Sequence, residues 1–198
     1  MKKMVISLLI ISIILSLLPM QIFAESTVRF TITPSVTEAH PGDEITYTVK
    51  MSAVQNLAGM KFKLVIPEGL TFIEGKEVDG IQETLNSAKA EFTPSTKVFV
   101  AGSCNYSSNT DTTLMTFKCS VDDDAVGAKE VTFIIDNDDI FDTSDDMVNI
   151  PVDYSNPGSK VEITIPSTGI SLNETNITLE IGTNKTLIAT LDPTNSTD

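Results

Sequence analysis

Residues 54–75 read VQNLAGMKFKLVIPEGLTFIEG, and this stretch decides the fold class. Met60, Phe62 and Leu64 alternate with two lysines, which is the period of a strand that buries one face and exposes the other. A proline and a glycine then form a tight turn, after which the alternation resumes. The stretch therefore predicts two half-buried strands joined by a turn.

The same alternation continues through residues 25–166 and predicts about nine strands. Only residues 78–90 lack a proline and could hold a helical turn, and Gly80 with the scattered apolar residues makes a loop an equal alternative. Many short alternating strands favour an all-β fold, an antiparallel β-sandwich of the jelly-roll type, because each strand then has one core face and one wet face. The expected inward positions include Val28, Phe30, Ile32, Ile45, Tyr47, Val49, Met51, Phe117, Cys119, Val121, Val131, Val148, Ile150, Val152, Val161, Ile163 and Ile165.

The first 24 residues have the pattern of a secretory signal peptide. Lys2 and Lys3 precede an apolar run over residues 5–18, and a small residue, Ala24, offers a cleavage site. The alternative is an uncleaved membrane anchor, but the run is short against the roughly 20 residues that span a bilayer. We therefore expect a mature protein that begins at Glu25 and is secreted, extracellular or on the bacterial cell surface.

A second β-pattern begins after a Pro-Ser-Thr-Gly break at 166–169. The chain is therefore expected to divide into a signal peptide (1–24), a sandwich (25–166) and an incomplete second β-domain (167–198). About 30 residues are too few to bury a core unaided, so the last part is expected to belong to a longer chain.

The protein is strongly acidic, with 27 Asp and Glu residues against 13 Lys and Arg residues and a net charge of −14. Such a field repels nucleic acid and anionic lipid, so neither is an expected partner, nor is a membrane once the signal is removed. It favours solubility, cations or basic protein surfaces.

Cys104 and Cys119 are the two cysteines of the chain. In a secreted protein they can form a disulfide, worth about 3 kcal/mol if unstrained. A simple hairpin centred near Ser108 leaves Cys119 out of register with Cys104, so two free buried thiols are an equal alternative.

The densest acidic run covers residues 136–146. Its carboxylates at Asp136, Asp138, Asp139 and Asp142 are candidate calcium ligands, because Ca²⁺ takes several oxygen ligands. The run lacks the glycine and the closing glutamate of an EF-hand loop. A solvated acidic loop is the simpler interpretation, and no cofactor is otherwise expected.

Neither catalysis nor sugar stacking is favoured. His40 is the single histidine and sits in a proline turn, which indicates a surface residue, and no carboxylate pair or phosphate loop stands out, so an enzyme is not expected. The chain has no Trp, and of its tyrosines Tyr47 falls on the buried side of its strand. Tyr106 is the one candidate for an exposed stacking ring.

Residues 27–165 resemble the cohesin module of bacterial cellulosomes, a jelly roll related to carbohydrate-binding modules. The resemblance lies in Pro41-Gly42-Asp43 before a strand, in the loop and strand from Asn56 to Leu64, and in the strands at 114–121 and 161–165. It departs from the family at Ile66-Pro67-Glu68, where an aromatic residue and an aspartate are usual. It implies a dockerin-type partner, without assigning contact residues.

Residues 169–195 resemble the opening third of a group 2 bacterial Ig-like domain. The matching pieces are Gly169-Ile170-Ser171-Leu172-Asn173, Leu179-Glu180-Ile181-Gly182 and the segment 186–195. The resemblance implies a spacer or adhesive unit.

These observations predict a secreted, non-catalytic binding or scaffolding module that presents a sheet face to a protein partner, within a polysaccharide-degrading system as the resemblance implies. Direct binding of a polysaccharide by the same fold, and an architectural segment of a surface adhesin, are the alternatives.

Overall fold

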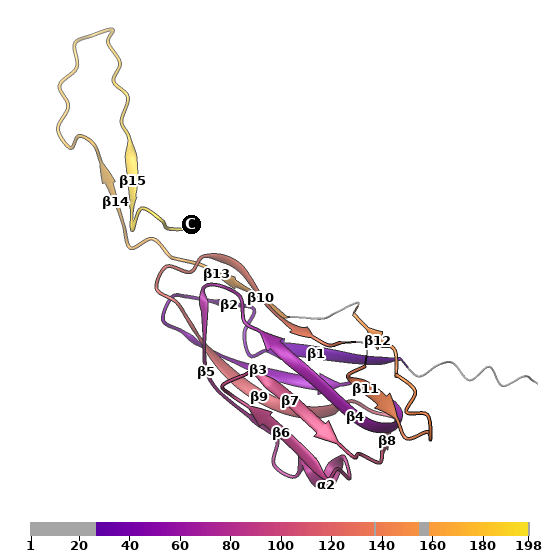
Figure 1. The fold of residues 1–198 in the computed structure, drawn as a ribbon. Coiled ribbons are helices and arrows are strands. Elements are labelled where there is room, and N and C mark those ends of the chain that lie inside the picture. The colour runs from indigo at the N-terminus through magenta and orange to yellow at the C-terminus, as the bar shows by residue number, and fades with distance from the viewer. Residues whose placement is uncertain (1–26, 137, 155–158, 198) are drawn as a thin grey trace, which may run out of the picture.

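A computed structural model describes residues 27–136, 138–154 and 159–197. In these residues two β-sheets pack face to face, and a two-stranded ladder follows them (Figure 1). The all-β sandwich expected from the alternation is confirmed, while the signal peptide, residues 1–24, lies outside the described residues. No helix in the described part of the chain is long and apolar enough to cross a membrane.

The first sheet has five strands in the order β12-β1-β3-β9-β5. The residues expected to face inward do so: Ile45, Tyr47 and Val49 are each fully buried. Their side chains and those of the neighbouring strand β9 form one wall of the core. The strands are β1 (Val28–Pro34), β3 (Glu44–Met51), β5 (Leu70–Glu77), β9 (Thr112–Val121) and β12 (Val152–Asp153).

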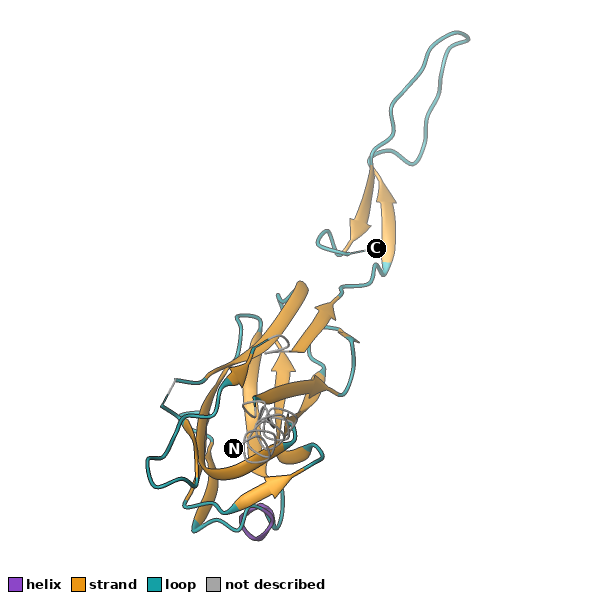
Figure 2. Ribbon diagram, turned by 90° about the vertical axis from the view of Figure 1, so that its right-hand side faces the viewer, coloured by secondary structure: helices purple, strands orange, loops and turns teal. Residues whose placement is uncertain are grey.

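The second sheet runs β2-β13-β10-β4-β7-β6, and β8 and β11 also pair with the long strand β4. Figure 2 shows the short helix α2 (Ile81–Thr84) at one end of the sandwich. The strands are β2 (Glu38–Ala39), β4 (Val54–Val65), β6 (Lys89–Thr93), β7 (Val98–Gly102), β8 (Tyr106–Ser108), β10 (Gly127–Ile134), β11 (Ile140–Asp142) and β13 (Ser159–Ile163).

Aromatic rings join the two sheets at the centre of the core. Phe62 of β4 lies 5.5 Å from Phe30 of β1 in the opposite sheet, measured between ring centroids. Within its own sheet it stacks on Phe99 at 5.2 Å and meets Phe133 edge-on at 5.7 Å. The stretch that set the fold class therefore supplies the residue on which both layers pack.

Some details of the strand prediction are wrong. The described part of residues 27–166 contains thirteen strands rather than nine, because β2, β6, β8 and β11 have only two to five residues each, too few to show a period. Two pairs, β1 with β12 and β2 with β13, are parallel. Val148 is 52% exposed instead of inward, because the chain at residues 143–149 forms turns and only Val152–Asp153 pairs as a strand.

The C-terminal segment forms a ladder of β14 (Gly169–Leu172) and β15 (Ala189–Asp192). Its apolar side chains face water: Ile170 is 68% exposed, Leu179 52% and Ile188 60%. The segment is thus paired β-structure without a core of its own, and its Ig-like character stays a prediction.

Candidate functional site

The outer side of the sheet β10-β4-β7-β6, here called the patch face, carries an apolar cluster. Ile134 of β10 lies opposite Lys63 of β4, and Lys63 lies opposite Val98 of β7. The four apolar side chains, Val65, Val98, Val100 and Ile134, are here called the outer patch. Val65 is 36% exposed and Ile134 52%, and the two valines of β7 are partly exposed. Cross-strand neighbours on one sheet face lie within side-chain reach, so these apolar side chains surround Lys63 on that face.

Ion pairs frame the outer patch. The Lys61 ammonium lies 2.9 Å from an Asp139 carboxylate oxygen, and Lys89 lies 2.7 Å from Glu91 on the same strand. The hydrogen bond and the charge of Asp139 raise the pKa of Lys61. Apolar side chains with a charged, hydrated rim are typical of protein interfaces. Here one lysine, Lys63, also lies among the apolar side chains.

Strand β11 pairs with β4 at one end of the patch face and contributes the aromatic ring of Phe141. Phe141 pairs with Gly59 of β4, and its ring occupies the space over that glycine. A Cβ built on Gly59 lies 2.4 Å from Phe141 Cζ, so no side chain fits there while the ring stays. The absence of a side chain at Gly59 thus leaves the space that the Phe141 ring occupies.

We expect Gly59→Ala to lower the free energy of unfolding by about 1 to 3 kcal/mol, because the Phe141 ring must move away from the new methyl group. The backbone of Gly59 is not in the left-handed region, so the methyl group itself is the cause. In a Phe141→Ala background the same change should cost much less, because the space is then free. Urea unfolding of the four proteins measures this coupling. Equal costs in both backgrounds would contradict the packing described.

The acidic run does not converge on one point. Asp142 accepts hydrogen bonds from the backbone and hydroxyl of Ser144, which lower its pKa, while Asp138 accepts one from Asn149. Asp139 binds Lys61 and also accepts from the backbone N–H of Asp136. Within the described residues no three His, Cys, Asp or Glu side chains gather as a metal site. Asp138, Asp139 and Asp142 thus accept hydrogen bonds from groups of the same segment, residues 136–149. Calcium binding stays a prediction.

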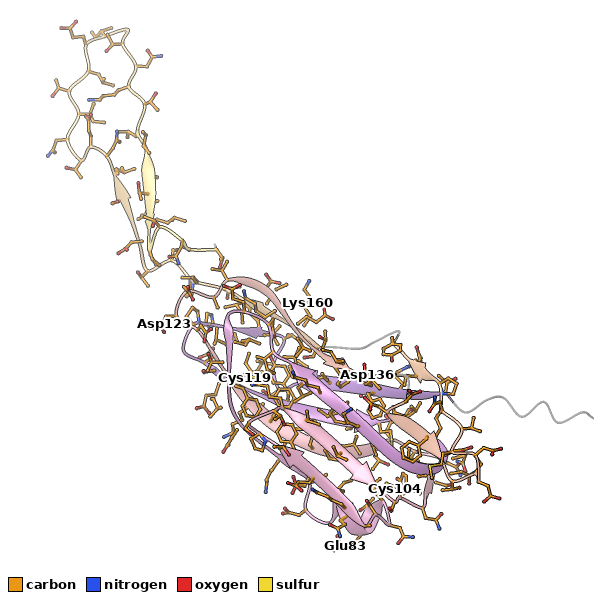
Figure 3. All side chains as sticks on the ribbon, in the orientation of Figure 1. Glu83, Cys104, Cys119, Asp123, Asp136 and Lys160 are labelled. Carbon is orange, nitrogen blue, oxygen red and sulfur yellow. The ribbon has the colours of Figure 1, made fainter. Side chains whose placement is uncertain are left out.

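Both cysteines are free, buried thiols. Cys104 follows β7 in the second sheet, whereas Cys119 lies in β9 of the first and pairs with Ile45 and Phe72 (Figure 3). Of the two alternatives that the sequence left open, the structure has the free thiols. Burial raises the pKa of Cys104, and it raises that of Cys119 to about 12.

Because a thiolate is the reactive form, we expect both thiols to resist iodoacetamide at pH 8 in the native protein. In urea without reductant, intact-mass spectrometry should show two adducts. A sample reduced beforehand provides the control and should give the same mass. Absence of adducts in the unreduced, unfolded sample would establish a disulfide instead.

The opposite sheet face is polar. A shallow groove of about 310 Å³ crosses β3, β9 and β5, and its lining includes Thr46, Thr116, Glu74 and Lys118. Lys118 is already paired with Glu74 at 3.1 Å. Hydroxyls and one ion pair line this groove without an exposed ring on which a sugar stacks.

The remaining residues singled out in the sequence have structural roles. Tyr47 is buried as expected and stacks on Phe117 at 4.8 Å. Tyr106 is half-buried rather than exposed, with its hydroxyl 2.5 Å from that of Thr112. His40 is an exposed residue at a turn, as predicted. Its Nδ1 lies 3.4 Å from a carboxylate oxygen of Asp43.

Comparison with known proteins identifies the fold. No protein-family model matches the chain, and no curated protein matches it. Among solved structures, the seventh ScaB type I cohesin from Pseudobacteroides cellulosolvens aligns with a TM-score of 0.53 at 11% identity, covering 77% of this chain and 99% of that one. The cohesin–dockerin complex Coh-OlpC-Doc435 from Clostridium thermocellum aligns with a TM-score of 0.52 at 14% identity, covering 69% and 93%. The sandwich has the cohesin fold.

Proposed function

We propose that this chain, whose sandwich has the cohesin fold, is a non-catalytic module that binds a protein partner of the dockerin type through the patch face. The observation that carries the proposal is the outer patch: four apolar side chains on the outer side of a rigid sheet, framed by ion pairs. Solved structures of this fold include cohesins bound to dockerins.

The physics of the patch face suits protein binding. Ile134 and Val65 expose apolar area that a partner can remove from water, which is favourable by roughly 25 cal/mol per Å². The strands beneath are held by the fully buried core around Phe62, so little order has to be gained on binding. The charged rim adds specificity.

The test is isothermal titration of the mature protein with a panel of type I and type II dockerin modules, and with soluble polysaccharides. We expect saturable binding to at least one dockerin and none to the polysaccharides. Polysaccharide binding without any dockerin binding would overturn the proposal and favour the carbohydrate-binding alternative. Binding to neither would leave an architectural role.

We also place the protein outside the cell, as a secreted or surface-attached component of a bacterial assembly. The signal-peptide pattern of residues 1–24 supports this location. Sequencing the N-terminus of secreted protein tests it: a chain that starts at Glu25 is expected, and one that starts at Met1 would contradict it.

Residues 167–198 are, in this proposal, the first strands of a separate Ig-like domain. Their two strands pair with each other, and Ile170 and Ile188 remain exposed, as expected for a sheet that lacks its covering layer. We expect residues 25–166 alone to unfold at the same temperature as residues 25–198 in calorimetry. A clear loss of stability in the shorter chain would show that the segment belongs to the sandwich.

A further inference from the structure

The patch face carries lysines as well as acidic side chains, although the protein as a whole is strongly acidic. Lys61, Lys63, Lys89 and Lys160 lie on the outer sides of its strands and of the adjacent β13. The whole chain has only 13 Lys and Arg residues against 27 Asp and Glu residues. Glu91, Glu130 and Glu162 lie on the same outer sides, so what distinguishes one lysine from another is whether an acidic side chain lies next to it.

Three of these lysines have an acidic neighbour. Lys61 is paired with Asp139, Lys89 is paired with Glu91, and Lys160 lies opposite Glu130 in the register of β13 and β10. Lys63 is exposed and has no ion pair with any acidic side chain in the described part of the chain. Its register partners on the two neighbouring strands, Ile134 and Val98, are both apolar, so unlike Lys160 it has no acidic side chain opposite it.

Lys63 also lies at the centre of the outer patch. Ile134 and Val98 flank it on the two neighbouring strands, and Val65 follows it on the same side of β4. A partner that covers these side chains removes water from the ammonium group. A buried charge is costly unless it is paired and hydrogen-bonded.

We propose that the partner meets this face with an acidic surface, in which a carboxylate flanked by apolar side chains pairs with Lys63. This inference rests on the proposed function and goes beyond it, because it gives the sign of the partner's charge. The overall acidity of the chain suggests a basic partner. At the contact itself, however, a basic group would face an unpaired ammonium, and like charges across an interface disfavour binding.

The same dockerin panel tests the inference when its members span acidic and basic net charges. The variants are Lys63→Glu and, as a control, Lys76→Glu. Lys76 is an exposed lysine of β5 in the other sheet, 3.6 Å from a carboxylate oxygen of Asp79. We expect the tightest binders to be acidic, to lose about 30-fold or more in affinity with Lys63→Glu, and to be unaffected by Lys76→Glu. Lys63→Glu should gain affinity for basic members.

Three other outcomes are informative. Binding that Lys63→Glu leaves unchanged, or tight binding confined to basic dockerins, would overturn the acidic-partner inference and leave the proposed function standing. No binding by any dockerin would overturn the proposed function, and this inference with it. Circular dichroism of each variant confirms that the sheet content is intact.

Discussion

Phe62→Ala is expected to lower the free energy of unfolding by about 3 to 5 kcal/mol. The side chain is fully buried and contacts Phe30, Phe99 and Phe133. Its removal leaves a cavity between the two sheets, where the surrounding rings relax only in part. Since domains of this size lose roughly 3 to 5 °C in Tm per kcal/mol, a fall of about 10 to 20 °C should follow in calorimetry.

The matched control is Phe141→Ala, which removes the same ring from the surface of the same sheet. Phe141 is only partly buried and packs on Gly59 rather than between the layers, so its loss should cost clearly less. Phe62→Leu, which keeps most of the volume, should recover much of the stability. Equal losses for the Phe62 and Phe141 truncations would contradict the central position of Phe62.

The long strands could be predicted because their burial follows a period of two. Strand β3 has four inward residues, among them Ile45 and Tyr47, and β4 has Met60, Phe62 and Leu64. Strand β6 has only Ala90 and Phe92 inward, and β11 has a single buried residue. One or two inward residues are too few to reveal a period of two. These short strands form because they pair with neighbouring strands, and the sequence alone does not show which strands those are.

The outer patch was missed for a related reason. Val65, Val98 and Ile134 come from three strands far apart in the sequence, and only the pairing register brings them together. Val65 did carry a local signal, because it is an apolar residue at an outward position of an otherwise regular strand. The contact of Gly59 with Phe141 had no such signal, since neither residue predicts the other.

Ile134→Asp is expected to weaken binding to a dockerin partner by about 100-fold or more while leaving the fold intact. The side chain is 52% exposed in the free protein and lies beside Lys63 and Val65 in the outer patch. When a partner covers it, the substituted carboxylate is desolvated, and the apolar contact area is lost. The introduced aspartate can also form an ion pair with Lys63, and the Lys63 ammonium is then no longer available to a carboxylate of the partner.

The control for this variant is Ile73→Asp. Ile73 is 45% exposed and lies in β5 of the opposite sheet, so it undergoes the same chemical change at similar exposure. Both variants should unfold at similar temperatures, while titration with the same dockerin should detect a loss only for Ile134→Asp. If Ile73→Asp abolishes binding and Ile134→Asp does not, the partner binds the outer side of the opposite sheet, which β3, β9 and β5 form. The site would then have to be moved to the opposite side of the sandwich.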